Sequence, residues 1–373
     1  MPESDALEEK LAKDIIRDYR GVAKEVGATA KYHGIPAWAT YGCKPWAILT
    51  LTIGQEVGMP KRERVACAAL VDLGSRAVAL ADDMIDKELP VTLETMWAQR
   101  DCLWGTLTML SRHERKGILS RENYYKIFYL IEDLQRFMFD GMYWQREHGK
   151  LDNKNVTFEE FLEKYLDKIC GGLFYWSIIP VGDYHPPAQE QITAAVPAVK
   201  NFARVFQMKD DVGDILQDFR ENQLTSALFF VRDKPREFER LKSEAKKSER
   251  RLSEEEFSKL FPESYEKING FIRTEEESAL QTLVAANIPE RYYDTIGILV
   301  NNKLYRALRA KIDKKLYGKK PELPKQYTPE ERERVRGILR KTRQIQENAA
   351  KGVFAAIAVD AERKEHKRMY NPE

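Results

Sequence analysis

The chain has 373 residues, 43% hydrophobic and 32% charged, a composition that supports a buried core and excludes a disordered protein. Its 61 basic and 59 acidic side chains leave a net charge of +2, which indicates neither a nucleic-acid partner nor a membrane surface. No apolar run approaches the roughly 20 residues that span a bilayer, the four cysteines form no Cys-x-x-Cys pair, and the N-terminus is charged from its start. We therefore expect a reduced, soluble, cytoplasmic protein without an integral membrane segment or a nucleic-acid partner.

Helical periodicity dominates the sequence. Apolar residues recur at spacings of three and four almost throughout, and alternating strand-like runs are scarce. The first helix is expected around residues 11–19. Further helices are expected at 45–58, 61–87, 92–112, 120–148, 157–179, 187–218, 222–232, 262–286, 288–315 and 328–365. Turn residues such as His185-Pro186-Pro187 separate them, so we predict an all-α fold.

Two segments depart from this pattern. Residues 233–261 contain a run with few apolar side chains, which favours a charged surface insertion. Residues 317–373 open on Gly318-Lys319-Lys320-Pro321 and end in a basic helix, which favours an appended C-terminal helical extension. The main helical domain is accordingly predicted to span residues 1–316.

The first acidic cluster is Asp82-Asp83-x-x-Asp86, at the end of a strongly apolar helix. Asp82 and Asp86 project from one face, one turn apart. Like charges at this spacing destabilise a helix, and the helix dipole disfavours acids near its C-terminus. A bound cation would offset both effects, whereas an acidic helix end that faces water is the simpler alternative.

The second acidic cluster, Asp210-Asp211-x-x-Asp214, repeats the pattern, and Asp218 extends the same face. Apolar neighbours place this helix against the core, where carboxylates need paired cations. Two aspartate-rich helices facing each other would form an all-oxygen site, which suits hard divalent ions, chiefly Mg²⁺. The candidate metal ligands are Asp82, Asp83, Asp86, Asp210, Asp214 and Asp218, and Asp211 is a further candidate catalytic residue.

Metal ions between two such clusters would bind a diphosphate and make it a better leaving group. An allylic diphosphate would then ionise to a carbocation, which an apolar, aromatic-lined cavity would shelter from water. Ordinary helix packing is the alternative explanation for the candidate cavity residues. These are Ala77, Val78, Phe137 and Trp144.

The motifs resemble those of the class I isoprenoid synthases, in particular the trans-prenyl diphosphate synthases, over roughly residues 5–232. Asp82-Asp83-x-x-Asp86 is similar to the first aspartate-rich motif of the family, and Phe206-Gln207-x-x-Asp210-Asp211-x-x-Asp214 to the second. The resemblance implies a helical bundle around a central apolar cavity, a homodimer, an allylic prenyl diphosphate substrate, and three Mg²⁺ ions for which Mn²⁺ can substitute. The candidate residues for binding the substrate diphosphate are Lys44, Lys168, Gln207 and Arg220.

The chain also departs from the family in the cations that hold a second diphosphate. Pro45 and Trp46 follow Lys44 where an Arg is expected, and no Arg-Arg pair follows Asp86. Without such cations a second diphosphate would bind poorly. The sequence therefore favours a Mg²⁺-dependent terpene synthase that ionises an allylic diphosphate of C15–C20 or longer. Chain elongation with isopentenyl diphosphate and a non-catalytic regulatory subunit remain the alternatives, and head-to-head condensation matches the motifs less closely.

Overall fold

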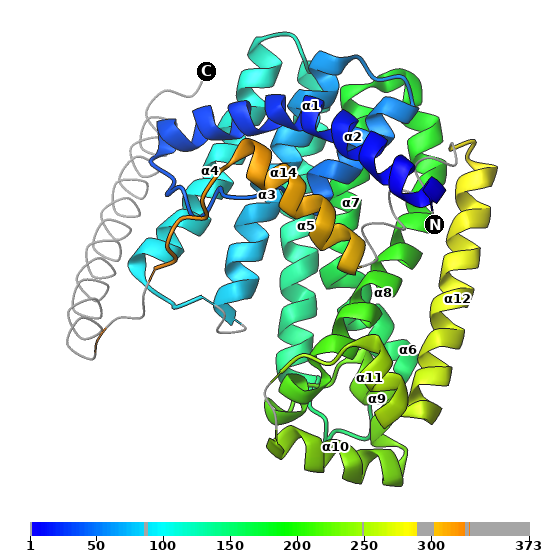
Figure 1. The fold of residues 1–373 in the computed structure, drawn as a ribbon. Coiled ribbons are helices and arrows are strands. Elements are labelled where there is room, and N and C mark those ends of the chain that lie inside the picture. Colours follow the sequence, from blue (N-terminus) through cyan, green and yellow to red (C-terminus); the bar gives the residue numbers. More distant parts are fainter. Residues whose placement is uncertain (1, 86–88, 248–249, 289–301, 325–327, 329–373) are drawn as a thin grey trace, which may run out of the picture. The chain divides into compact units, whose positions relative to one another are not determined.

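The structure is a computed structural model that describes residues 2–85, 89–247, 250–288, 302–324 and 328. Over these residues the protein consists of 13 α-helices and short helical turns without a β-strand, so the predicted all-α fold is confirmed (Figure 1). The contacts divide the chain into two units. One comprises residues 1–80 and 98–322, and the other comprises residues 81–97 and 323–373.

The N-terminal half contains α1 (Pro2–His33), α2 (Pro45–Glu56), α3 (Lys61–Ile85), α4 (Leu93–Arg115) and α5 (Arg121–His148). The last four lie within a few residues of the predicted ranges. Helix α2 is apolar on all sides, and its residues from Trp46 to Gly54 are buried, as expected for a helix inside the core. Helix α5 begins where the Ser120 side chain accepts a hydrogen bond from the backbone N–H of Asn123.

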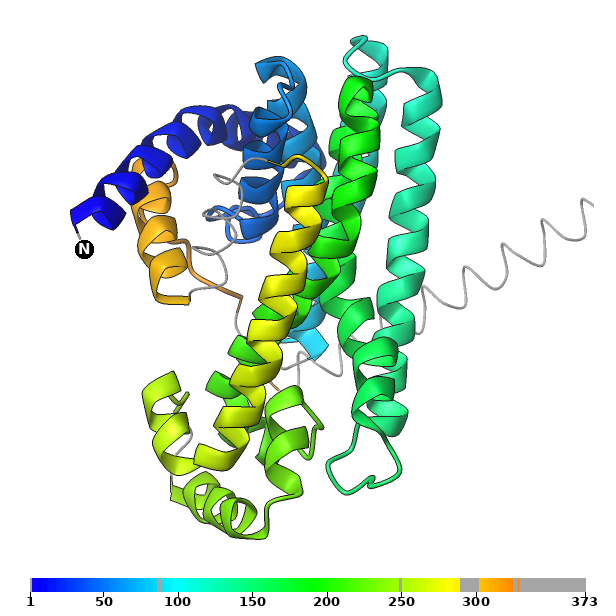
Figure 2. The same cartoon turned by 90° about the vertical axis from the view of Figure 1, so that its right-hand side faces the viewer.

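A continuous helical stretch follows, made of α6 (Phe158–Phe161), a π-helical segment (Leu162–Leu166) and α7 (Asp167–Tyr184). Helix α8 (Gln189–Arg220) comes next after a 3₁₀ turn (Pro186–Ala188). Helix α7 packs against α2, α5 and α8, and α8 packs in turn against α12 (Pro262–Ala285). Helix α5 runs alongside α7, and α12 runs alongside α8, as can be followed by colour in Figure 2. The core of the larger unit, which comprises residues 1–80 and 98–322, therefore lies around α7 and α8.

Three short helices pack near the C-terminal end of α8, as Figures 1 and 2 show. They are α9 (Ser226–Arg232), α10 (Pro235–Lys247) and α11 (Glu254–Leu260). Helices α10 and α11 lie within the segment that was expected to be a charged surface insertion. The segment is charged, but it buries Leu241, Ala245 and Phe257, and both helices contact α8.

The C-terminal part of this unit includes α14 (Asn302–Leu316), which packs against α1. The predicted helix at 288–315 is thus described from Asn302 onward, and the predicted helix at 328–365 lies outside the described residues beyond position 328. The proposed boundary at residue 317 stays a prediction. Within the described part of the chain, no helix has the length and apolar character needed to cross a bilayer.

Asp183, near the end of α7, is a buried carboxyl group with an altered pKa. It is 8% exposed, and burial raises its pKa to about 6, although the charge of Lys126 pulls the pKa down. In the unfolded chain the same group loses its proton near the ordinary aspartate pKa of 3.8. The folded state therefore loses stability as pH rises from about 4 to about 6, and the penalty is complete above that range.

We expect Asp183→Asn to remove this penalty. At about pH 7.5 the variant should be more stable than the wild type by at most about 3 kcal/mol, and the gain should shrink towards about pH 4.5. Thermal unfolding at the two pH values measures the difference. Asp233→Asn is the control, because the Asp233 side chain is 71% exposed. An Asp183→Asn variant that is equally stabilised at both pH values would contradict the assignment.

Candidate functional site

The second acidic cluster lies on α8, close to where α9, α10 and α11 pack. Asp210 and Asp214 are one turn apart, with side chains 39% and 25% exposed. Their neighbours Val212, Ile215 and Leu216 are buried and hold the helix against the core. The predicted amphipathic placement of this cluster is therefore correct: its apolar residues face inward, and Asp210 and Asp214 remain partly accessible.

Asp211 lies differently from these two carboxylates. It is 3% exposed, and its Oδ2 accepts hydrogen bonds from the backbone N–H of Ser226 at 2.7 Å and from the Ser226 hydroxyl at 2.5 Å. Its Oδ1 accepts a hydrogen bond from Gln207 Nε2 at 2.7 Å. Burial raises the pKa of Asp211 to about 6 despite these bonds. The structure thus shows Asp211 and Gln207 in contacts that fix the start of α9.

Asp218, one turn beyond Asp214, is the last acid of this face. Burial raises the pKa of its carboxyl group well above the ordinary value, and the charges of Asp211 and Asp214 raise it further. Its backbone oxygen accepts a hydrogen bond from the N–H of Gln223 at 2.9 Å. Burial therefore favours the protonated form of the Asp218 carboxyl group.

Arg251 is the residue that the sequence did not reveal. Its Nη2 lies 2.6 Å from Asp210 Oδ1, and its Nε lies 2.8 Å from Asp214 Oδ1, so one guanidinium joins both carboxylates. Arg251 comes from the charged run between α10 and α11, which looks solvated in the sequence. Two local signals pointed to an ordered turn there: Ser253-x-x-Glu256 has the form of a helix capping box, and Leu252 precedes it.

The first acidic cluster lies at the C-terminal end of α3. Asp82 and Asp83 are partly exposed, and the backbone oxygen of Asp83 accepts a hydrogen bond from the N–H of Leu89 at 2.9 Å. Asp86 lies outside the described residues. Asp82 and Asp83 belong to the smaller unit and α8 to the larger one. A site shared by the two acidic clusters therefore stays a prediction.

Lys44 ends a loop that is fixed by a buried polar network. Arg76, 1% exposed, donates to Asp72 and to the backbone oxygens of Tyr41 and Gly42. Tyr19 donates to Asp72 and accepts a hydrogen bond from the N–H of Lys44 at 2.9 Å. Burial, followed by the charge of Asp72, raises the pKa of Tyr19 well above its ordinary value, so the phenol remains a donor.

The same loop is also held from α14. The backbone N–H of Cys43 donates to Asp313 Oδ1 at 2.8 Å, and Asp313 pairs with Arg309 at 3.3 Å. These contacts fix the backbone from which the Lys44 side chain projects. The expected contact of the Lys44 side chain with a diphosphate stays a prediction.

Lys168 follows the π-helical segment at the start of α7. Its Nζ lies 3.4 Å from Asp140 Oδ2 and 5.7 Å from the centre of the Phe137 ring. The preceding residue, Asp167, is held by Arg204 through contacts of 2.7 and 2.9 Å and by Lys200 at 2.8 Å. This clamp between α7 and α8 fixes the helix turn from which Lys168 projects.

The remaining candidate residues have mixed surroundings. Arg220 Nη1 donates to the backbone oxygen of Ala245 at 3.3 Å, which joins the end of α8 to α10. Among the candidate cavity residues, Ala77 is buried, and Val78, Phe137 and Trp144 are partly exposed. The Trp144 ring packs 6.5 Å from that of Phe161. Their predicted role as a cavity wall stays a prediction.

The donor set of the second cluster is compatible with a hard cation. In the described residues, no group of three or more acidic, histidine or cysteine side chains converges as a complete metal cage. Mg²⁺, however, is commonly bound by one or two carboxylates together with waters and substrate phosphates. Asp210 and Asp214 already share one positive group, the Arg251 guanidinium, so the two carboxylates can converge on a cation.

Comparisons with known proteins show which solved structures have a similar fold. No family model matches the chain, and no curated protein matches its sequence. Among solved structures, a polyprenyl synthase from Roseobacter denitrificans is similar, with a TM-score of 0.59 and 15% identity over 81% of this chain and 99% of that one. A polyprenyl synthetase from Streptomyces coelicolor A3(2) gives a TM-score of 0.55 and 17% identity over 80% and 98% of the chains.

A decaprenyl diphosphate synthase from Rhodobacter capsulatus is also similar, with a TM-score of 0.54 and 16% identity over 83% of this chain and 99% of that one. The chain has the class I isoprenoid synthase fold. The resemblance expected from the acidic motifs is thus confirmed at the level of the fold.

The buried Arg76–Asp72 pair gives a testable prediction. Removing one partner leaves a buried charge without compensation, so Arg76→Ala should destabilise the protein by about 3–5 kcal/mol. Thermal or urea unfolding measures the loss. Lys259→Ala is the control, since Lys259 forms an exposed pair with Glu255 on α11 and its loss should change the melting temperature little. Equal effects of the two substitutions would contradict the role of the buried network.

Proposed function

We propose that the protein is a prenyl diphosphate synthase that joins isopentenyl diphosphate to an allylic prenyl diphosphate with the help of Mg²⁺. The observation that carries this proposal is the pair Asp210 and Asp214, which converge on one positive group in a fold shared with prenyl synthases over about four fifths of the chain. The similar structures are named as a polyprenyl synthase, a polyprenyl synthetase and a decaprenyl diphosphate synthase. Their names support elongation over cyclisation.

In this proposal, Asp210 and Asp214 would hold Mg²⁺ from α8, and the motif of Asp82, Asp83 and Asp86 would supply further Mg²⁺ ligands. The metal supplies positive charge that stabilises the departing diphosphate. Lys44 and Lys168 project from fixed backbone and bind diphosphate oxygens as point charges. Lys168 would exchange its contact with Asp140 for the ligand, which costs little because the Asp140 side chain is 70% exposed.

A terpene synthase is the second candidate, and one observation favours it. The cations that would hold a second diphosphate are missing beside Lys44, where Pro45 and Trp46 follow, and after Asp86, where no arginine pair occurs. Such an enzyme would ionise one allylic diphosphate and would not consume isopentenyl diphosphate. A non-catalytic subunit is the third candidate and would turn over neither substrate.

One enzyme assay distinguishes the three candidate functions. The purified protein is incubated with Mg²⁺, allylic diphosphates from C10 to C25 and radiolabelled isopentenyl diphosphate, and the products are identified by mass spectrometry. We expect label in a longer prenyl diphosphate. An unlabelled hydrocarbon or alcohol would favour the terpene synthase instead, and no product from any substrate would favour the non-catalytic subunit.

The metal requirement is tested in the same assay. Excess chelator should abolish turnover, and Asp210→Ala should lower the rate by about 100-fold or more, because metal-assisted departure supplies much of the reduction of the barrier. Asp233→Asn, on the exposed turn after α9, serves as the control that should retain full activity. Full turnover in chelator would refute the metal-dependent mechanism.

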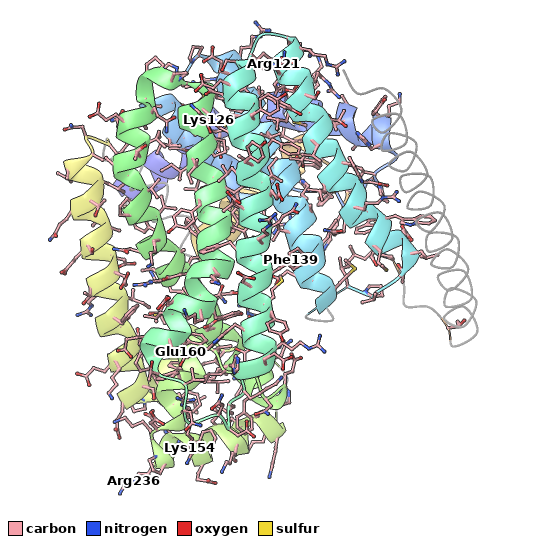
Figure 3. The ribbon with its side chains drawn as sticks, turned by 180° about the vertical axis from the view of Figure 1, so that it is seen from behind. Arg121, Lys126, Phe139, Lys154, Glu160 and Arg236 are labelled. Atoms are coloured by element: carbon pink, nitrogen blue, oxygen red, sulfur yellow. The ribbon has the colours of Figure 1, made fainter. Side chains whose placement is uncertain are left out.

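We also propose that the protein is a homodimer. Exposed aromatic side chains lie along α5 at positions 125, 129, 139 and 143, and the ion pair of Glu132 and Arg136 lies between them on the same face. These six positions recur in steps of four and three, the spacing of a helix that packs against another. Tyr129, Phe139 and Tyr143 are 58%, 58% and 67% exposed. Figure 3 shows Phe139 on this helix, well beyond Arg121 and Lys126 near its start.

Charges on this face of α5 should therefore break the dimer. We expect the wild type to elute as a dimer in size-exclusion chromatography with light scattering, and the double variant Tyr129→Glu/Phe139→Glu to elute as a monomer, because two carboxylates would be buried in the interface. Lys126→Glu on the same helix is the control and should remain dimeric. A monomeric wild type would contradict the proposal.

A further inference from the structure

Arg251 supplies the positive charge that faces Asp210 and Asp214 in the second acidic cluster. A single guanidinium pairs with carboxylates from two successive turns of α8, at 2.6 Å from Asp210 and 2.8 Å from Asp214. Two adjacent carboxylates without a cation would repel each other. The site therefore carries its own positive charge in the absence of metal.

The backbone that presents Arg251 is anchored directly after this residue. The N–H of Leu252 donates to the backbone oxygen of Gly213 at 2.9 Å, and the Leu252 side chain is 7% exposed. The next residue, Ser253, forms a reciprocal capping box with Glu256 that starts α11. The backbone after Arg251 is thus ordered, and the guanidinium of this 45% exposed side chain is positioned by its two carboxylate partners.

Helix α8 also leaves space for the guanidinium. Gly213 lies within the helix between the two carboxylates, where glycine costs about 1 kcal/mol relative to alanine. A Cβ atom at this position would lie 3.0 Å from Arg251 Nη2 and 3.1 Å from Nε, and these are its nearest contacts outside the helix backbone. The glycine is therefore explained by the close approach of Arg251.

We propose that Arg251 is a built-in cation that competes with divalent metal ions for Asp210 and Asp214. A metal ion can take these carboxylates only by displacing the guanidinium, so Arg251 weakens metal binding in the absence of substrate. This inference rests on the proposed metal site of the second acidic cluster. It adds a regulatory residue, supplied by the segment between α10 and α11, that raises the metal concentration needed to load the site.

Direct metal binding tests the proposal without any reaction. Mn²⁺ is titrated into the full-length protein without diphosphate, and free Mn²⁺ is followed by electron paramagnetic resonance. We expect Arg251→Gln to bind Mn²⁺ about tenfold more tightly than the wild type, as expected when a partly exposed two-carboxylate contact is lost. Arg250→Gln is the matched control: the neighbouring arginine pairs with Glu256 at 2.7 Å, and its loss should leave the affinity unchanged.

Two further variants keep the test decisive. Gly213→Ala retains Arg251 but crowds its guanidinium, so this variant should also bind Mn²⁺ more tightly than the wild type. If Arg251→Gln does not fold, the Mn²⁺ affinity of Gly213→Ala tests whether Arg251 competes with the metal. Adding Asp210→Asn to Arg251→Gln should abolish the gain, which assigns the tightened binding to the second cluster.

The outcomes for Arg251 and for the proposed enzyme can be told apart. A folded Arg251→Gln protein with unchanged or weaker Mn²⁺ affinity would overturn the competition, even if the wild type elongates prenyl diphosphates. Tightened Mn²⁺ binding in a protein that makes no product would support the competition and refute the enzymatic proposal. Tightening by Arg250→Gln to the same extent would also overturn the assignment to Arg251, because it would reflect only a loss of nearby positive charge.

Discussion

The need to balance negative charge on α8 governs this end of the molecule. Four carboxyl groups lie between Asp210 and Asp218 on a helix whose opposite face is packed into the core. Carboxylates withdrawn from water require a partner or a proton. Asp211 accepts hydrogen bonds from the start of α9, Asp210 and Asp214 share Arg251, and the raised pKa of Asp218 favours its protonated form. The placement of α9 and of the turn before α11 follows from these requirements.

The sequence predicts much of the fold, because helical periodicity and turn residues are local signals. The ranges expected for α2, α3 and α5 agree with the structure to within a few residues. The helices within the charged residues 233–261 give weaker local signals in the sequence. Helix α10 has a narrow apolar stripe whose buried members include Leu241 and Ala245, too few to distinguish it from a solvated helix by composition.

The candidate site was predictable only where its residues are close in sequence. The spacing of Asp210 and Asp214 is visible in the sequence as a motif. Their partner Arg251 lies 37 residues beyond Asp214 (251 − 214), in a run with many other charged residues, so the sequence gives no sign of the pairing. The same limit applies to Lys44, whose loop depends on Tyr19, Asp72 and Arg76 from two other helices. Pairings of this kind arise from tertiary packing, which no periodicity encodes.

The chain leaves α8 after Arg220 and returns to the same helix at Gly213, where the N–H of Leu252 meets its backbone oxygen. Ser226, at the start of this excursion, is also tied to α8 through Asp211. Both ends of the excursion are thus fixed on one helix, and the cost of closing a loop grows only slowly with its length. Descendants of this gene could therefore gain or lose residues around α10 while keeping the arginine in register, which makes the segment a site where metal sensitivity can evolve separately from the helical bundle.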